Sequence, residues 1–387
     1  MPRRRATFRQ ALLVTPEHRY ALDALLDALG LPFDERAAEA ARPEELDEVF
    51  GLLTLACERD AELDRHGRPL PPPDPPGPRV AELAAELGGR LGEEHRGFPG
   101  GARFLVALTH DVDVLGAGGV PTAFRKLGGG ILRRSKRRLR EGSAFLLDAL
   151  SSRDPAFPLS ELVSAERGHG WRSTCFFLAR QQDPHDGYPE RYRPALPGAL
   201  KATTAAGLEV ALHASYRARE RDGSIAEEAE LLDRPQGLRH HYLRSDPVRL
   251  AGELRVAGLR YDSSIGWPSL PGLRAGTPYP YRLWDPERRQ PGGWEVPLVL
   301  MDATLSEPHY LGLRADEAFA TAVAALEPLV EHGGAAAILW HPPLHHPRLA
   351  RGFDELYRRL LAWIAERGGW AGTAAETLDR WEARRAD

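Results

Sequence analysis

Aspartate and histidine residues follow several of the apolar segments that the sequence predicts to be strands. Asp111 and Asp113 come after the first such segment, His213 follows a later one, and His341 follows the last. Two carboxylates this close together destabilise each other unless a positive charge lies beside them. Carboxylate and imidazole groups are suitable ligands for a divalent metal that keeps open positions for water and substrate. The pattern therefore indicates a metal site at one end of a set of strands.

Each of these residues also has an ordinary structural explanation. A histidine at a strand end is more often a hydrogen-bonded structural group than a ligand. An aspartate after a strand commonly begins a turn or caps a helix. Several such residues on strands that share one sheet favour a site, because chemistry gathers where the carboxyl ends of parallel strands meet.

Short apolar segments alternate with amphipathic helical segments from residue 103 onward. The predicted strands are 104–108, 174–178, 208–212, 259–261, 295–300 and 335–340. The predicted helices are 159–167, 225–232, 247–256, 316–331 and 353–366. Repeated strand–helix–strand units predict an α/β protein with a largely parallel sheet, which in about 270 residues is an open doubly wound sheet or a barrel.

The sequence before this region divides into two parts. Residues 1–68 are predicted to be a helix-rich N-terminal region, because apolar residues recur there at helical spacing. Residues 69–78 are dominated by proline, which favours an extended conformation and predicts a linker. Residues 79–387 are then the α/β barrel domain, with its core at 103–370.

Composition excludes several classes of protein. The 387-residue chain is 42% hydrophobic with a net charge of −4, so it is neither disordered nor collagen-like. Its two cysteines, Cys57 and Cys175, cannot form a cysteine-based zinc site or a disulfide framework. No nucleic-acid-binding module is recognisable. Because the sequence shows neither a secretory signal nor a membrane-spanning segment, we expect a cytoplasmic protein.

The order of motifs in this sequence resembles that of the polysaccharide deacetylase family, the NodB-type domains of carbohydrate esterase family 4. The motifs that carry this resemblance lie at 109–113, 207–213, 237–242, 258–267 and 338–341. Together they span most of the segment 103–370. The resemblance implies a distorted (β/α) barrel.

The resemblance also implies roles for individual residues. Asp113 and His213 would bind a divalent metal ion, with zinc the first expectation and cobalt, manganese or nickel as alternatives. Asp111 would be the general base that deprotonates the attacking water, and Arg239 would hold that base ionised. His341 would be the general acid for the departing amine. The implied activity is a metal-dependent de-N-acetylase whose partner is a carbohydrate or an acylated amino sugar in a glycan or glycan precursor.

The sequence departs from the family pattern at Arg217, where a second metal-binding histidine is usual. His241, or as a weaker alternative His240, could supply the missing imidazole. The other alternative, slightly less favoured than His241, is a site with no third protein ligand. Two alternative functions therefore stay open. One is a non-catalytic carbohydrate-binding protein that retains the fold, and the other is a hydrolase of a small-molecule amide.

A strongly basic segment lies at 125–140, with eight lysines and arginines and no acidic residue. Peripheral contact with a membrane or an anionic carrier is one interpretation. A solvated helical surface is the favoured one, because basic runs are common on helix surfaces.

Five aromatic residues occur in the glycine- and proline-rich stretch 267–294. Their rings could stack on sugar faces or pack into a small core of their own. Arg274, in the same stretch, could line a cleft or form a structural ion pair. His345 and His346 are expected to be exposed in a proline-rich loop.

Overall fold

The structure is a computed structural model that describes residues 15–116, 120–135, 138–139, 142–143, 145–147, 157–233, 235–346 and 349–385. Its strands are β1 (Leu105–Val112), β2 (Thr174–Leu178), β3 (Glu209–Ala214), β4 (Gly237–His240), β5 (Tyr261–Asp262), β6 (Tyr281–Asp285), β7 (Gln290–Glu295), β8 (Leu298–Met301), β9 (Ala335–Leu339) and β10 (Trp370–Gly372). Its α-helices are α2 (Pro16–Leu29), α3 (Glu35–Ala40), α4 (Pro43–Leu53), α5 (Arg79–Leu91), α6 (Val120–Leu132), α8 (Leu159–Arg167), α9 (Pro189–Ala205), α10 (Ser224–Ala229), α11 (Leu250–Ala257), α12 (Asp302–Ser306), α13 (Ala315–His332), α14 (Phe353–Glu366) and α15 (Ala374–Ala383). Short 3-10 helices are η2 (Ala56–Glu58), η3 (Pro184–Asp186), η4 (Ala218–Glu220), η5 (His241–Leu243) and η6 (Pro342–His345).

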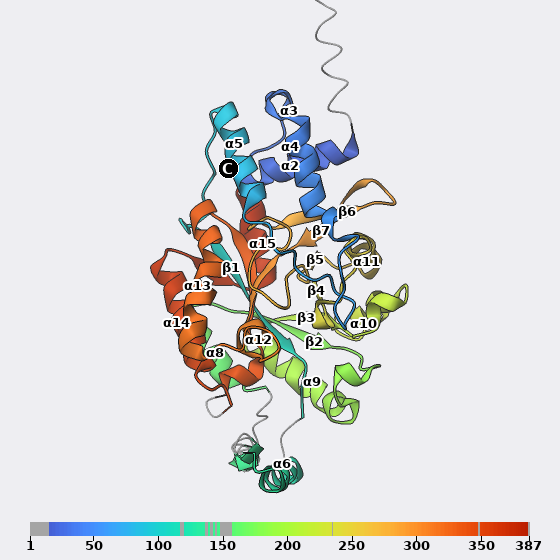
Figure 1. Ribbon diagram of the computed structural model, residues 1–387, viewed down its shortest axis with the longest axis vertical. Helices are drawn as coiled ribbons and strands as arrows, with labels where there is room; N and C mark the ends of the chain where they lie inside the picture. Colours follow the sequence, from blue (N-terminus) through green and yellow to red (C-terminus); the bar gives the residue numbers. More distant parts are fainter. Residues whose placement is uncertain are drawn as a thin grey trace, which may run out of the picture.

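The strands form one curled sheet in the order β6-β7-β5-β4-β3-β2-β1-β9-β8, with β10 paired to β1 (Figure 1). All pairings are parallel except that of β6 with β7. Within the described residues, no pairing joins the edge strands β6 and β8, so the barrel is open on that side. The predicted α/β class and distorted barrel are confirmed.

Strand β1 lies near the middle of the sheet and is buried along its whole length. Its neighbour β9 begins with three alanines that pair in register with Leu105, Val106 and Ala107. On the other side, His213 of β3 pairs with Arg239 of β4. Because parallel strands end at the same edge, this register brings the residues that follow β1, β3, β4 and β9 to one end of the barrel.

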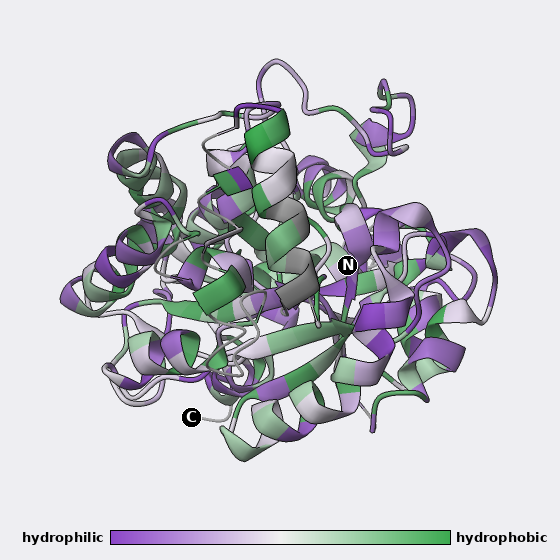
Figure 2. Ribbon diagram, turned by 90° about the horizontal axis from the view of Figure 1, so that it is seen from below, coloured by the Kyte–Doolittle hydropathy of each residue, from purple (hydrophilic) through white to green (hydrophobic). Residues whose placement is uncertain are grey.

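Amphipathic helices cover the sheet. The residues of α14 that face the core recur at helical spacing; they are Phe353, Leu356, Tyr357, Leu360, Leu361 and Ile364. Figure 2 shows the same pattern in the outer helices, which carry both hydrophilic and hydrophobic residues. No helix in the described part of the chain is long and apolar enough to cross a bilayer.

The N-terminal helices pack directly on the sheet. Helices α2 to α5 share one hydrophobic cluster with residues of β1 to β8. Tyr20 of α2 donates a hydrogen bond to the carbonyl of Arg282 at 2.5 Å. Glu17 pairs with Arg289 at 2.8 Å in the turn between β6 and β7. The division at 1–68, 69–78 and 79–387 stays a prediction.

The hairpin of β6 and β7 was not predicted. Its second strand contains Pro291, Gly292 and Gly293, residues that are depleted in strands and read as loop. The predicted strand 295–300 is instead two strands, because β7 ends at Glu295 and β8 begins after Pro297.

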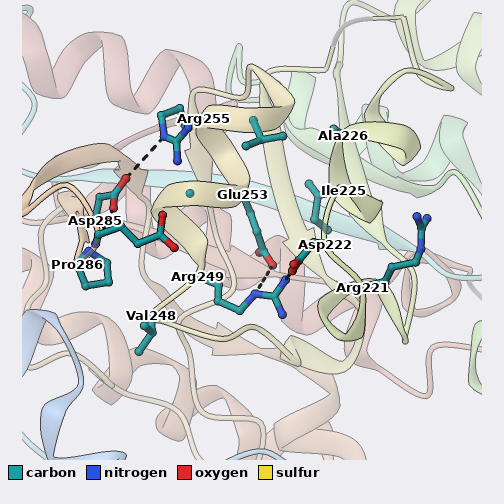
Figure 3. A pocket seen from close by; sticks show the side chains of 14 residues that line it. Arg221, Asp222, Ile225, Ala226, Val248, Arg249, Glu253, Arg255, Asp285 and Pro286 are labelled. Atoms are coloured by element: carbon teal, nitrogen blue, oxygen red, sulfur yellow. Dashed lines mark hydrogen bonds and ion pairs between the residues drawn. The ribbon is translucent and has the colours of Figure 1, made fainter.

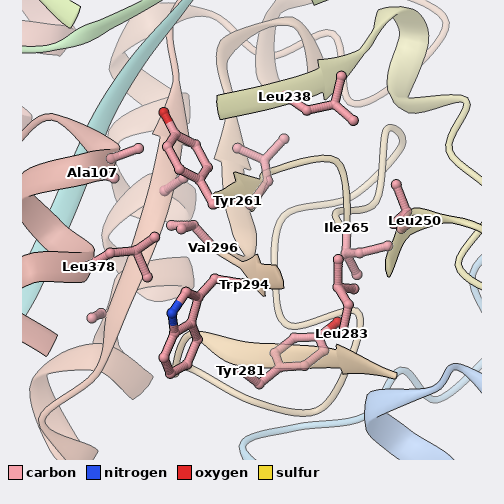
Figure 4. Close-up of a cluster of buried hydrophobic side chains, with 14 of the residues drawn as sticks. Ala107, Leu238, Leu250, Tyr261, Ile265, Tyr281, Leu283, Trp294, Val296 and Leu378 are labelled. Carbon is pink, nitrogen blue, oxygen red and sulfur yellow. The ribbon is translucent and has the colours of Figure 1, made fainter. Parts of the chain in front are cut away.

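The aromatic residues of the stretch 267–294 are core residues. All five side chains are at most 8% exposed, and Figure 4 shows Tyr281 and Trp294 among other buried side chains. Arg274 forms a structural ion pair with Glu58 at 2.6 Å. The expected exposure of His345 and His346 is wrong, because both side chains are buried. Several side chains of the basic segment 125–140 lie outside the described residues, so both interpretations of this segment stay predictions.

Candidate metal centre and active site

Three metal-donor side chains converge just beyond the carboxyl ends of β1, β3 and β4. Asp113 follows β1, His213 lies near the end of β3, and His241 follows β4. His213 Nε2 lies 3.1 Å and His241 Nε2 lies 3.6 Å from Asp113 Oδ1. One ligand atom from each of the three residues lies within 4.8 Å of the others.

The hydrogen bonds of the two histidines leave the inward nitrogens free to act as ligands. His213 Nδ1 lies 2.9 Å from the carbonyl oxygen of Arg239, which can only accept, so Nδ1 carries a proton. His241 Nδ1 lies 2.8 Å from Asp186 Oδ1, which requires a proton there too. In the neutral rings, both Nε2 atoms then present lone pairs toward Asp113.

The electrostatics of the cluster favour a cation. Oxygen Oδ1 of Asp113 is buried, and no described residue donates a well-formed hydrogen bond to it. Burial would raise the pKa of Asp113, but the imidazoles of His213, His241 and His341 hold it well below its usual range. Burial would lower the pKa of His213, but Asp111 and Asp113 raise it. The two carboxylates thus favour a positive charge at His213 Nε2. A proton on Nε2 can supply this charge, and a divalent ion can take the place of the proton.

Asp111 lies beside this cluster and is fixed by an arginine. Oxygen Oδ1 of Asp111 accepts from Arg239 Nη1 at 2.8 Å, and Oδ2 lies 3.6 Å from His213 Nε2. Arg239 is completely buried and also donates to Ser263 O, Ser263 Oγ and Thr109 Oγ1. All three nitrogens of the guanidinium therefore have acceptors, and the second oxygen of Asp111, Oδ2, lies toward the metal-donor cluster.

His341, which follows β9, also faces the cluster. Its Nε2 lies 3.6 Å from Asp113 Oδ2, and its Nδ1 lies 2.6 Å from Asp302 Oδ1. Asp302 Oδ2 also accepts from the backbone N–H of His341 at 2.7 Å. Burial would lower the pKa of His341, but Asp302, Asp113 and Asp111 raise it to about 10. The ring is thus held as a proton donor at neutral pH.

Two carboxylates that orient these histidines were missed from the sequence. Asp302 directly follows β8, so the strand-end rule that found Asp111 could have found it. Asp186 lies in η3, and its carboxylate accepts from the backbone N–H groups of Gln182 and Tyr216 as well as from His241. A carboxylate that holds the outer nitrogen of a metal-binding histidine fixes its tautomer and orientation.

Arg217, which departs from the motif, and His240, the weaker candidate ligand, lie outside the metal-donor cluster. The side chain of Arg217 is 60% exposed and donates to Asp183 Oδ2 at 2.7 Å. His240 is buried, but its ring lies 3.2 Å from Glu253 on α11. The structure therefore brings His241, and neither His240 nor Arg217, to Asp113 and His213.

A second buried network lies beneath β1. His110 Nε2 lies 2.8 Å from Glu166 Oε1, and both side chains are completely buried. Glu166 also accepts from Ser173 at 2.7 Å and from Tyr357 at 2.9 Å. His110 Nδ1 lies 2.6 Å from the carbonyl oxygen of Trp340, the residue before His341. This network joins β1, which carries Asp111, to the segment after β9 that carries His341.

Glu166→Ala is expected to lower the free energy of unfolding by about 3–5 kcal/mol, because it leaves His110 and two hydroxyls buried without their acceptor. Urea denaturation followed by circular dichroism measures this change. Glu366→Ala, an exposed glutamate at the end of α14, is the control and should change stability by about 0.5 kcal/mol or less. Equal stability of the two variants would contradict the structural role of Glu166.

A pocket of about 280 Å³ lies apart from this site, between α10, α11 and the turn after β6 (Figure 3). Two of its arginines pair with carboxylates that also line it. Arg249 pairs with Asp222, and Arg255 Nε lies 3.6 Å from Asp285 Oδ2. Among the described residues, no histidine lines this pocket, so it offers no donor set like that of Asp113, His213 and His241.

An open (β/α) barrel with a metal-donor cluster at the carboxyl ends of its strands defines the structural class. A protein assigned as a polysaccharide deacetylase from Mycobacterium smegmatis has a TM-score of 0.51 and 18% identity, over 74% of this chain and 93% of that one. The PuuE allantoinase has a TM-score of 0.49 and 16% identity, over 84% and 97%. A protein assigned as a polysaccharide deacetylase from Pseudomonas aeruginosa PAO1 has a TM-score of 0.47 and 18% identity, over 84% and 98%. No protein-family model and no curated protein matches the sequence. The chain has the fold of the polysaccharide deacetylase-like proteins.

Proposed function

We propose that the protein is a metal-dependent amide hydrolase that removes an acyl group, acetyl in the first instance, from an N-acylated amino sugar in a glycan or glycan precursor. The observation that carries this proposal is the convergence of Asp113, His213 and His241, with Asp111 and His341 both beside them. The fold shared with the Mycobacterium smegmatis protein supports the same class of reaction.

Asp113, His213 and His241 would hold the ion, with zinc first and cobalt, manganese or nickel as alternatives. One carboxylate and two imidazoles are a ligand set that leaves coordination positions open. When bound, a divalent ion polarises the substrate carbonyl and makes water more acidic.

The residues around this cluster supply the proton transfers. Asp111 accepts the proton of the attacking water on Oδ2, because Oδ1 is occupied by Arg239. His341 donates a proton to the departing amine, which leaves poorly without one. Asp302 holds the His341 ring with Nε2 toward the cluster. Asp111 thus serves as the base and His341 as the acid, and both lie beside the metal-donor cluster.

Acetate release from N-acetylhexosamine oligomers, measured with the protein loaded with each of the four metals and after chelation, tests the proposal. Release that disappears with the chelator and returns with metal is the expected result. Release from simple amides alone would favour the small-molecule hydrolase. The absence of release together with the absence of bound metal would favour the non-catalytic carbohydrate-binding protein. The departure from the motif at Arg217 motivates this last alternative, and the position of His241 beside Asp113 and His213 supports the hydrolase over it.

Asp302→Asn is expected to move the alkaline limb of the kcat/KM–pH profile to lower pH by about one unit or more. The active form of His341 is protonated, and loss of the neighbouring negative charge lowers the pKa of that cation. Activity is therefore lost at a lower pH than in the parent protein. Asp47→Asn changes a carboxylate that also faces an imidazole, on α4, and should leave the profile in place. An unchanged alkaline limb in Asp302→Asn would exclude His341 as the general acid.

A further inference from the structure

A turn of the N-terminal region lies against the mouth of the barrel. In Figure 1 the segment between α4 and α5 runs down past β5 and β4 toward α10. An isolated β-bridge between Leu63 and Pro69 closes the turn. Arg68, which is buried, donates to Asp64 within the turn and to the carbonyl oxygen of Tyr242 at 2.9 Å. The turn is thus attached to the residue that follows His241.

The barrel also holds the turn from its own side. Arg244, which is buried, donates to the carbonyl oxygen of His66 at 2.7 Å. Arg219 donates to the carbonyl oxygen of Gly67 at 3.2 Å. Hydrogen bonds donated by the turn to the barrel and by the barrel to the turn therefore fix the backbone of the turn. The turn is a rigid part of the rim, and its side chains are pre-organised.

A row of rings links the turn to the metal-donor cluster. The ring centroid of His66 lies 4.7 Å from that of Tyr242, which in turn lies 4.7 Å from that of His241. Tyr242 is half-buried and has a φ of 60°, a left-handed conformation that is strained for tyrosine. The surroundings hold Tyr242 in this position between the turn and the cluster.

Arg65 extends from this turn with an exposed side chain. Its Nε donates to His66 Nε2 at 3.0 Å, and His66 Nδ1 lies 3.0 Å from the hydroxyl of Tyr216. Burial and the charge of Arg68 lower the pKa of His66 to about 4, so the neutral ring can accept this bond. Among the described residues no carboxylate forms an ion pair with Arg65. One edge of the guanidinium is therefore oriented by the protein, and the two Nη groups are left for a ligand.

We propose that Arg65 recognises an anionic group, a carboxylate or a phosphate, on the amino-sugar substrate. Its Nη groups bind two oxygens of that anion while the acylated amine lies at the metal-donor cluster. A guanidinium presents parallel N–H donors that match such oxyanions. This inference rests on the proposed amide hydrolase function, and it deepens that function by naming a substrate with a negative charge near the reacting amide.

Three matched probes test the proposal: a neutral N-acetylglucosamine oligomer, the same oligomer with a phosphate group, and the same oligomer with a carboxylate. Calorimetric binding to the metal-loaded protein and kcat/KM are measured for each probe. The parent protein should prefer at least one anionic probe over the neutral one, and Arg65→Gln should lose about tenfold or more of that preference. Arg65→Lys should retain part of it. The probe with the larger preference identifies the anion.

Arg103→Gln is the matched control, because Arg103 is exposed at the opposite end of the sheet, before β1. It should leave the preference for the anionic probe unchanged. The proposal is overturned if the parent protein binds neutral and anionic probes equally. It is also overturned if Arg65→Gln weakens all probes by the same factor. Because binding does not require turnover, an anion preference without acetate release would contradict the amide hydrolase function and not the role of Arg65.

Discussion

His241→Ala is expected to weaken metal binding by about 100-fold or more and to abolish metal-dependent acetate release. The substitution removes one of three protein ligands, leaving Asp113 and His213, and even the loss of a residue that only orients a ligand costs about 10–100-fold in metal affinity. Elemental analysis of the purified protein and competition with a chromophoric chelator measure the change. Asp186→Asn should give a smaller loss, since it leaves the imidazole in place and only weakens its orientation.

Arg217→Ala is the control for this experiment. Arg217 occupies the position where the motif pattern expects a histidine, but its exposed side chain pairs with Asp183. The variant should therefore bind metal like the parent protein. If Arg217→Ala lost metal and His241→Ala retained it, the ligand set would be wrong and the third ligand would have to come from another part of the chain.

Four of the site residues that the sequence predicts share one property. Asp111, Asp113, His213 and His341 all lie at or just after the end of a strand, and strands are recognisable as short apolar segments. In a parallel sheet this local signal has a global consequence, because all strands end at the same edge. The fold class and much of the candidate site could be predicted for that reason.

The residues that were missed depend on contacts between distant segments. Asp186 meets His241 only because η3 packs beside the turn after β4. The turn 64–68 is held at the rim by hydrogen bonds to residues far away in the sequence, among them Arg219, Tyr242 and Arg244. Such contacts leave no periodic pattern in the sequence. Asp302 is a different case, because it directly follows β8 and the strand-end rule could have found it, although the predicted strand 295–300 began three residues before β8 and ended one residue before its end.

Asp111→Asn is expected to lower kcat by about 10²–10⁴-fold while the protein keeps its metal. The amide oxygen of asparagine can still accept the hydrogen bond of Arg239, so the geometry is retained. The amide nitrogen replaces Oδ2, however, and cannot accept a proton from water. Steady-state kinetics and metal content, measured on the same preparation, check both parts of the prediction. Activity within about fivefold of the parent protein would place the base elsewhere.

Asp113→Asn distinguishes the role of Asp113 as a metal ligand from the role of Asp111 as the general base. Asp113 Oδ1 is the oxygen nearest to both ligand histidines, whereas Asp111 Oδ1 is bound to Arg239. An amide in place of Asp113 loses the negative charge that attracts the cation, so this variant should lose bound metal together with activity. Asp111→Asn should lose activity alone. If both variants lost metal equally, Asp111 would have to be counted among the ligands, and the general base would have to be a different residue.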